Sequence, residues 1–118
     1  MTVVSTLDVT GLTAREYRAV MDELGVERRP EGGIYLHLTT PTDFGYRIVE
    51  IWDEKQNFDR FVEHRLAPAN EAIGLQRATE ISVTPLHNFF APRLAELPGV
   101  VSSLPGAPRA EGAAAAGR

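Results

Sequence analysis

The most constraining feature of this sequence is the order in which two hydrophobic periods alternate along it. Residues 2–9 alternate apolar and polar side chains, as a half-buried strand does. A stripe at helical spacing follows in residues 13–24, and then come two more alternating segments, at about 33–40 and 44–52, around a turn that contains Pro and Gly. A second helical stripe and a last alternating segment complete the series. The sequence therefore predicts the element order β-α-β-β-α-β.

The ends of the two helices carry specific signals. Thr13 is expected to be the N-cap of the first helix, with Glu16 completing a capping box, and Gly25 follows the last apolar residue as a terminating glycine. Asp53 is expected to cap the second helix. Its apolar stripe consists of Phe58, Phe61, Val62, Leu66, Ala69 and Ile73. Pro68 interrupts this stripe and cannot continue the hydrogen-bond ladder, so we expect a break or kink just before it.

The last strand is expected in "ATEISVTPLHNFF", residues 78–90. Pro85 within it indicates an edge strand, a bulge or a strand end. Beyond residue 90 the periodicity is lost, and Pro, Gly and Ala dominate. We therefore expect one domain, 1–90, and a C-terminal extension, 91–118, that is partly helical and then flexible.

This element order is that of the α+β, ferredoxin-like fold, in which both helices cover one face of a four-stranded antiparallel sheet. Strand parity assigns Ile34, Leu36, Leu38, Val49 and Ile51 to the face under the helices, and Tyr35, His37, Tyr46, Glu50 and Trp52 to the other face. An uncovered face with these aromatic side chains would be a large exposed patch. We expect a second copy of the sheet to cover it, which gives a homodimer built as an α+β barrel.

Bulk composition excludes several classes of partner. The formal charge of −4 and the pI near 5.3 argue against nucleic acid and against anionic membranes, because both attract a positive surface. The chain has no cysteine, which removes disulfide and thiolate chemistry. The N-terminal residues lack the pattern of a signal peptide, and no apolar run reaches the length of a membrane span. A cytoplasmic protein is expected.

Three stretches carry a resemblance to a known family: "GGIYLHL", "GYRIVEIWDEKQNFDRFVEHRLAPA" and "ISVTPLHNFF". They resemble the dimeric α+β barrel superfamily, and most closely its small actinobacterial proteins grouped with antibiotic biosynthesis monooxygenases. The resemblance covers about residues 2–90 and implies a homodimer with a ligand cavity in each protomer. The superfamily includes cofactor-free monooxygenases, haem-degrading enzymes, polyketide cyclases and lactone isomerases.

The resemblance transfers to individual positions only in part. Trp52 matches the Trp that ends the third strand in monooxygenases that oxidise anthrone-type polyketides, but their Asn four residues earlier is replaced here by Ile48. Haem-degrading members add a His on the following helix, where this chain has His64. Cyclases of this fold use a His and a Tyr as an acid–base pair, for which His37 and Tyr46 are the candidates at other positions.

For each candidate residue a structural role stays open beside the functional one. His37 next to Glu50 suits a general acid or base, and equally a hydrogen-bonded pair in a polar interior. Trp52 would stack on a flat substrate or plug the barrel end, and Tyr46 and Tyr35 would stabilise an oxyanion or pack as structural tyrosines. The remaining substrate-binding candidates are His64, on the border of the helical stripe, and His87 and Asn88, at the end of the last strand.

We therefore expect a cofactor-independent, monooxygenase-like enzyme that acts on a small aromatic or polyketide-derived molecule. His37, alone or with Glu50, would remove a proton, and the resulting carbanion would reduce dioxygen without metal or flavin. No spacing among the three histidines predicts a metal site. A cyclase or isomerase with the same acid–base residues, and a non-catalytic ligand-binding module, are the alternatives.

Overall fold

A computed structural model describes residues 1–108 of the chain. They divide into two compact units, the first spanning Met1–Asn88 and the second beginning at Phe89. No helix within the described residues is long and apolar enough to span a bilayer. The end of the tail that is expected to be flexible, residues 109–118, lies outside the described residues.

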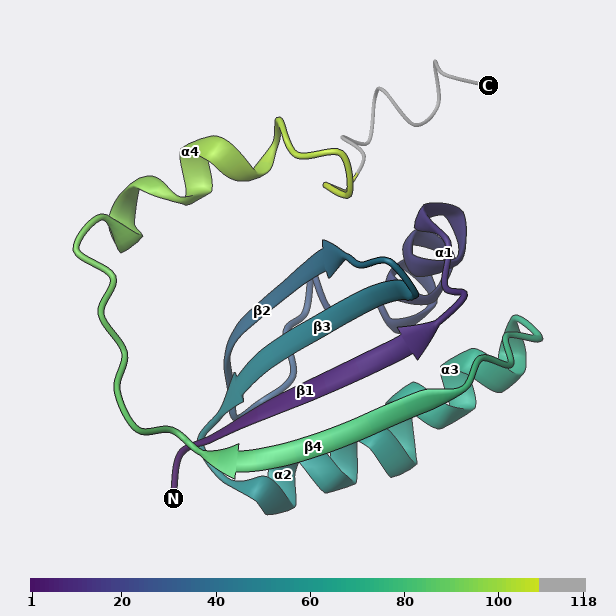
Figure 1. Cartoon of the computed structure of the whole chain (residues 1–118), viewed down its shortest axis with the longest axis horizontal. Helices are drawn as coiled ribbons and strands as arrows, with labels where there is room; N and C mark the ends of the chain where they lie inside the picture. The colour runs from purple at the N-terminus through teal and green to yellow at the C-terminus, as the bar shows by residue number, and fades with distance from the viewer. Residues whose placement is uncertain (109–118) are drawn as a thin grey trace. The chain divides into compact units, whose positions relative to one another are not determined.

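The first unit is a four-stranded antiparallel sheet with helices on one face (Figure 1). The strands are β1 (Val3–Thr10), β2 (Ile34–Pro41), β3 (Gly45–Trp52) and β4 (Thr79–Pro85), in the spatial order β2-β3-β1-β4. The ferredoxin-like fold expected from the element order is confirmed. Pro85 is the last residue of β4, an edge strand, where its missing N–H costs no ladder bond.

Helix α1 (Ala14–Leu24) follows its sequence signals closely. Thr13 accepts a hydrogen bond from the Glu16 backbone N–H at 3.1 Å, and the Glu16 side chain accepts one from the Thr13 N–H at 3.0 Å. Gly25 ends the helix at φ 67°, a left-handed conformation that glycine adopts without strain. The capping box and the terminating glycine together set where Tyr17, Val20, Met21 and Leu24 face the sheet.

The second helical region differs from expectation at its start and at its proline. Helix α2 (Lys55–Phe61) has Glu54 as its N-cap, so the prediction of Asp53 in that role is wrong; Asp53 instead accepts a hydrogen bond from Asn57 Nδ2 at 2.7 Å. The expected break takes the form of a π-helical turn, η1 (Val62–Leu66), in which the Ala67 N–H bonds to the Val62 carbonyl. Helix α3 (Ala67–Ala72) continues from it, with Pro68 in its first turn, because the wider turn accommodates a residue without an N–H.

A β-bulge in β2 separates Ile34, which packs against the core as expected, from Leu36 and Leu38, which do not. The pairing shifts between Ile34 and Leu36, so Tyr35 is an extra residue, and its side chain is 69% exposed. The side chains of β2 therefore change face after the bulge. His37 points under the helices with its cross-strand partner Glu50, whereas Leu36 and Leu38 point to the open face.

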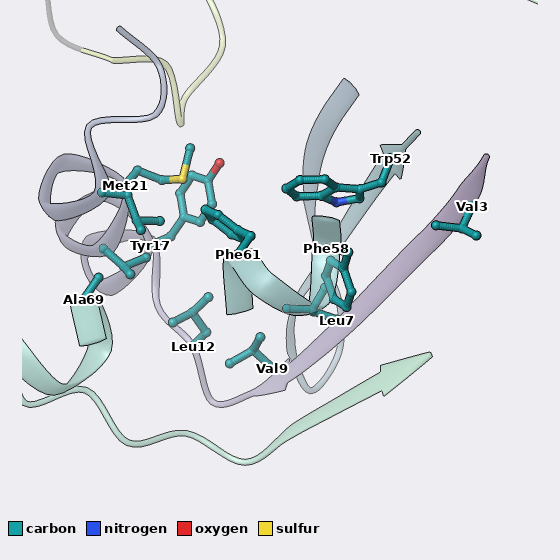
Figure 2. Close-up of a cluster of buried hydrophobic side chains, with 12 residues drawn as sticks. Val3, Leu7, Val9, Leu12, Tyr17, Met21, Trp52, Phe58, Phe61 and Ala69 are labelled. Carbon is teal, nitrogen blue, oxygen red and sulfur yellow. The ribbon is translucent and has the colours of Figure 1, made fainter. Parts of the chain in front are cut away.

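The expected face assignment is also wrong along β3, which has no bulge. Trp52 lies under the helices, with its ring centroid 5.9 Å from Phe58 and 5.5 Å from Phe61 (Figure 2). Tyr46 and Ile48 also pack against this core. Val49 and Ile51 were expected to face the helices in their place. The open face instead carries an apolar strip from three strands, defined here as Val4, Leu36, Leu38, Val49 and Ile51.

The second unit contains a short 3₁₀ turn, η2 (Leu94–Glu96), followed by α4 (Pro98–Val101). Its side chains at Phe89, Phe90, Leu94, Leu97, Val100, Val101 and Leu104 are exposed. Arg93 and Glu96 form an ion pair at 2.6 Å within it. Both turns lie in the C-terminal extension, residues 91–118, which was expected to be partly helical.

Candidate functional site

Two strands and one helix bring the polar residues of the candidate site together. His37 of β2 and Glu50 of β3 are direct cross-strand partners, so their side chains leave the sheet side by side. Helix α1 crosses above them and supplies Tyr17 from its buried face. The side chains that meet here come from positions 17, 37, 50 and 52, and only the folded sheet makes them neighbours.

These four side chains form one hydrogen-bonded chain. The Tyr17 hydroxyl lies 2.8 Å from His37 Nε2, and His37 Nδ1 lies 2.7 Å from Glu50 Oε2. The Trp52 indole N–H donates to the other carboxylate oxygen, Oε1, at 3.1 Å. The Thr39 hydroxyl is a second neighbour of His37 Nε2, at 3.1 Å. We refer to Tyr17, His37, Glu50 and Trp52 as the polar chain.

The polar chain favours one arrangement of protons. A carboxylate only accepts hydrogen bonds, so Glu50 takes one from Trp52 and one from the Nδ1–H of His37. This tautomer leaves the Nε2 lone pair to accept from the Tyr17 hydroxyl. His37 is thus held as a base with its lone pair directed at a phenol, in the orientation that a His–carboxylate pair provides to general bases.

Burial sets the protonation of Tyr17. It is the largest influence on this group and raises the pKa of the Tyr17 phenol above its ordinary value of 10.0. The hydroxyl therefore keeps its proton at neutral pH and can donate to His37. Nearby, Arg18 and Glu27 form an ion pair at 2.9 Å, and burial raises the pKa of the Glu27 carboxyl.

Replacing Tyr17 with Phe is expected to reduce the fall in the free energy of unfolding as the pH rises above neutral. The folded-state pKa lies above the unfolded value of 10.0, so the unfolded chain loses its proton first as the pH rises. The stability contributed by the protonated phenol is complete below the unfolded pKa and is lost as the pH rises toward the folded one. Urea denaturation from about pH 9 to about pH 11 measures this slope. Equal slopes for the wild type and Tyr17→Phe would contradict it, and Tyr35→Phe, at a residue 69% exposed, is the control.

An apolar cavity of about 160 Å³ lies beside the polar chain, between the sheet and the helices. Its walls come from β1, β3 and β4, from α1, η1 and α3, and from the loops next to them. They are lined by Leu7, Val9, Leu12, Val20, Ile48, Val62, Leu66, Ala67, Asn70, Leu75, Arg77, Thr79 and Ile81. Ile48, which stands where the resemblance implied an Asn, is one of these wall residues.

The cavity and the polar chain adjoin each other through two elements. Ile48 is the cross-strand partner of Thr39, whose hydroxyl touches His37. Val20 follows Tyr17 by three residues on the same buried face of α1. The polar chain itself does not line the cavity, and Thr39 and the buried face of α1 are the links between the two.

The structure brings together three of the predicted site residues, His37, Glu50 and Trp52. His37 is next to Glu50, as expected, and Trp52 is a second partner of the same carboxylate. Tyr46 stacks on Tyr17, with ring centroids 6.4 Å apart. Its ring supports the phenol that contacts His37.

The other predicted site residues lie elsewhere. Tyr35 is on the bulge and exposed, and His87 and Asn88 are exposed after the end of β4. His64 lines a separate, polar hollow with Glu23 and Arg65. Within residues 1–108, no three His, Asp or Glu side chains gather as a metal site would require.

Tyr17, Thr39 and Asn70 were not predicted as site residues. Tyr17 has the spacing of a core position and also of a hydrophobic staple, so its sequence pattern carried no sign of a polar role. Thr39 stands two residues after His37, so strand alternation places it on the same face, and this spacing is the signal that points to it. Nothing in the sequence around Asn70 indicates a cavity.

Comparisons with known proteins connect this chain to others through structure alone. No protein-family model matches the sequence, and no curated protein matches it. The cofactor-independent oxygenase SnoaB from Streptomyces nogalater, in a mutant form, is similar with a TM-score of 0.55 at 13% identity, over 75% of this chain and 94% of that one. A conserved protein from Methanosarcina mazei is similar with a TM-score of 0.56 at 14% identity, over 74% and 95% of the two chains.

A third solved structure comes from Caulobacter crescentus and is described as a candidate antibiotic biosynthesis monooxygenase. It is similar with a TM-score of 0.52 at 21% identity, over 74% of this chain and 89% of that one. Likeness at this level of identity identifies a fold and not a reaction. The chain therefore has the ferredoxin-like fold that is shared by SnoaB and by antibiotic biosynthesis monooxygenase-like proteins.

Proposed function

We propose that this protein is a cofactor-independent oxygenase that acts on a small, electron-rich aromatic molecule. The observation that carries the proposal is the polar chain, in which His37 is oriented by Glu50 and directed at the Tyr17 hydroxyl, next to an apolar cavity. Packing alone does not require a buried, hydrogen-bonded Tyr, His and carboxylate. Apolar side chains of the same shape would fill the space without the free-energy cost of burying these polar groups. Pairing of this kind is typical of acid–base sites.

The reaction proposed for a phenol needs dioxygen as its only co-reactant. The phenolic proton passes to the Tyr17 oxygen while the Tyr17 proton moves to His37 Nε2, and Glu50 stabilises the imidazolium that forms. The phenolate then transfers electrons to dioxygen, and a C–O bond forms at the ring carbon para to the oxygen. The peroxide anion takes back the proton held by His37. The hydroperoxide then loses its para hydrogen as a proton and its outer oxygen as hydroxide, which together make one water, and a quinone remains. The phenol and one O₂ thus give a quinone and one H₂O, with one oxygen atom in each.

An oxygen electrode tests this proposal with 1,3-dihydroxybenzene as the substrate. We expect uptake of one O₂ for each hydroxyquinone formed, and ¹⁸O₂ is expected to label one product oxygen and one water. Turnover without dioxygen would favour the alternative of a cyclase or isomerase that uses the same acid–base residues. Binding of aromatic molecules without any turnover would favour the non-catalytic binding module.

We also propose that the open face of the sheet forms a homodimer. The apolar strip (Val4, Leu36, Leu38, Val49 and Ile51) lies opposite the helices. Leu38 is 46% exposed, whereas Ile51 is already buried, at 8% exposure. Covering such a strip with a second copy removes apolar surface from water at about 25 cal/mol per Å². The correction of the sheet faces changes which residues form this surface, and it leaves the expected arrangement of the two copies unchanged.

Sedimentation equilibrium tests the dimer. The wild type is expected to sediment at twice the mass of the 12.9 kDa chain, and Leu38→Glu at the mass of one chain, because it places a charge in the apolar strip. Glu80→Gln is the matched control, since Glu80 lies at the exposed start of the edge strand β4. A monomeric wild type would contradict the proposal.

A further inference from the structure

The cavity between the sheet and the helices combines a size and a polar group that together specify a ligand. Its volume is about 160 Å³. An apolar cavity of about 150 Å³ engineered in another protein stays dry and binds benzene. A cavity of this size therefore matches a single six-membered aromatic ring.

The wall of the cavity contains one unsatisfied polar group. Asn70 of α3 lines the cavity, and its side-chain Oδ1 is buried without a hydrogen-bond partner. A buried carbonyl oxygen without a donor costs about 1–3 kcal/mol, so its presence calls for a donor in the cavity. A phenolic hydroxyl supplies this donor and can also accept, so that it pairs with either end of the Asn70 amide.

The charges at the cavity exclude an ionic ligand. Among the described residues that line it, only Arg77 is charged, and its guanidinium binds the Glu16 carboxylate through two hydrogen bonds, at 2.9 and 3.2 Å. The pair is neutral overall and lowers the pKa of the Glu16 carboxyl. An anion would therefore lose its hydration without gaining a free partner, whereas a neutral ring loses little.

We propose that this cavity binds a neutral, single-ring phenol, with the ring among the apolar side chains and the hydroxyl hydrogen-bonded to Asn70. The ring then lies between α3 and the wall formed by Val20 and Ile48. As a statement about binding, the inference is independent of the oxygenase chemistry. The identification of this phenol as the substrate rests on the proposed function.

Isothermal titration calorimetry on the full chain tests the inference with p-cresol, toluene and 2-naphthol. p-Cresol fits the cavity but carries a methyl group at the position that would be oxidised, so binding is measured without turnover. We expect p-cresol to bind about 10-fold more tightly than toluene, which is roughly the effect of one hydrogen bond to a buried group. 2-Naphthol, with a second ring, is expected to bind at least about 10-fold more weakly than p-cresol.

Substitutions assign the binding to Asn70 and to this cavity. Asn70→Leu, of similar size, is expected to bind p-cresol and toluene equally, whereas the exposed amide variant Gln56→Leu keeps the 10-fold preference. Ile81→Phe fills the cavity from the exposed edge strand and is expected to abolish binding of both rings. If Ile81→Phe does not fold, p-cresol-induced shifts of the Leu7, Val20 and Ile48 methyl resonances in the wild type locate the ring instead.

Three results would overturn the inference: equal binding of p-cresol and toluene by the wild type, an unchanged preference in Asn70→Leu, or tighter binding of 2-naphthol. Methyl shifts away from the cavity would do so as well. Binding as expected without oxygen uptake on 1,3-dihydroxybenzene would leave the phenol site intact and remove the oxygenase proposal. Oxygen uptake without p-cresol binding would leave the oxygenase proposal intact and remove the phenol site.

Discussion

Replacing Trp52 with Ala is expected to lower the free energy of unfolding by about 3–5 kcal/mol, the usual range for a buried Trp or Phe truncated to Ala. The Trp52 side chain is 0% exposed and is packed against Phe58 and Phe61 of α2. Truncation removes the ring contacts, leaves a cavity, and takes the N–H donor from Glu50 Oε1. The loss of packing and the loss of a donor to a buried carboxylate act in the same direction.

Urea denaturation followed by far-ultraviolet circular dichroism measures this loss, because Trp52 is the only Trp and its fluorescence disappears with it. Trp52→Phe keeps a ring but not the N–H, so it separates the hydrogen bond from the packing. Phe90→Ala, at a side chain 84% exposed, is expected to change the free energy of unfolding by less than about 0.5 kcal/mol. A loss below about 1 kcal/mol in Trp52→Ala would show that the helices do not depend on this ring.

Replacing His37 with Ala is expected to lower kcat/KM by about 100- to 10,000-fold, the range attributed to a general base. The imidazole is the group that takes the proton, and its side chain is 24% exposed, so part of it remains accessible. The effect is measured as oxygen uptake with 1,3-dihydroxybenzene. Thr40→Ala, on the opposite face of the same strand, is the control and is expected to retain its activity.

Glu50→Gln separates the orienting role of the carboxylate from the role of the base. Gln keeps the shape of Glu50 but cannot stabilise an imidazolium through charge, so kcat is expected to fall while KM for the ring changes little. The pH at which kcat is half-maximal is also expected to move, which a merely structural role would not cause. Unchanged kcat in both His37→Ala and Glu50→Gln would remove the polar chain from the mechanism and leave the cavity as a binding site only.

Two features of the sheet faces differ from expectation, and they have different physical origins. Alternation places successive side chains on opposite faces, and this rule correctly grouped His37 with Glu50 and Trp52. One extra residue, Tyr35, moves the following side chains of β2 to the face opposite Ile34. Strand β3 has no bulge, and its face was assigned wrongly because alternation groups side chains without showing which group lies under the helices. A bulge leaves no periodic signal in one strand read alone, because the mismatch exists only relative to the neighbouring strand.

The same distinction explains the helix ends. Thr13, Glu16 and Gly25 act through neighbours within a few residues, so their roles could be predicted from spacing. Asp53, like Thr13, is a residue type that favours the N-cap position and directly precedes a helical stripe. Its carboxylate instead accepts a hydrogen bond from Asn57, and Glu54 is the N-cap of α2. Pro68 correctly marked an irregularity, although its form as a π-helical turn depends on how η1 packs under the sheet.

By itself the sequence determined the order of the elements, the limits of α1, and the grouping of His37, Glu50 and Trp52 on one sheet face. These features depend on periodicity, capping and turn chemistry, which operate within a few residues. Only the tertiary structure decided that this face lies under the helices, that Tyr17 completes the polar chain, and that Asn70 lies on a cavity wall. Such contacts join residues that are 13 to 20 positions apart or more, and their energies depend on packing and burial that exist only once the chain has folded.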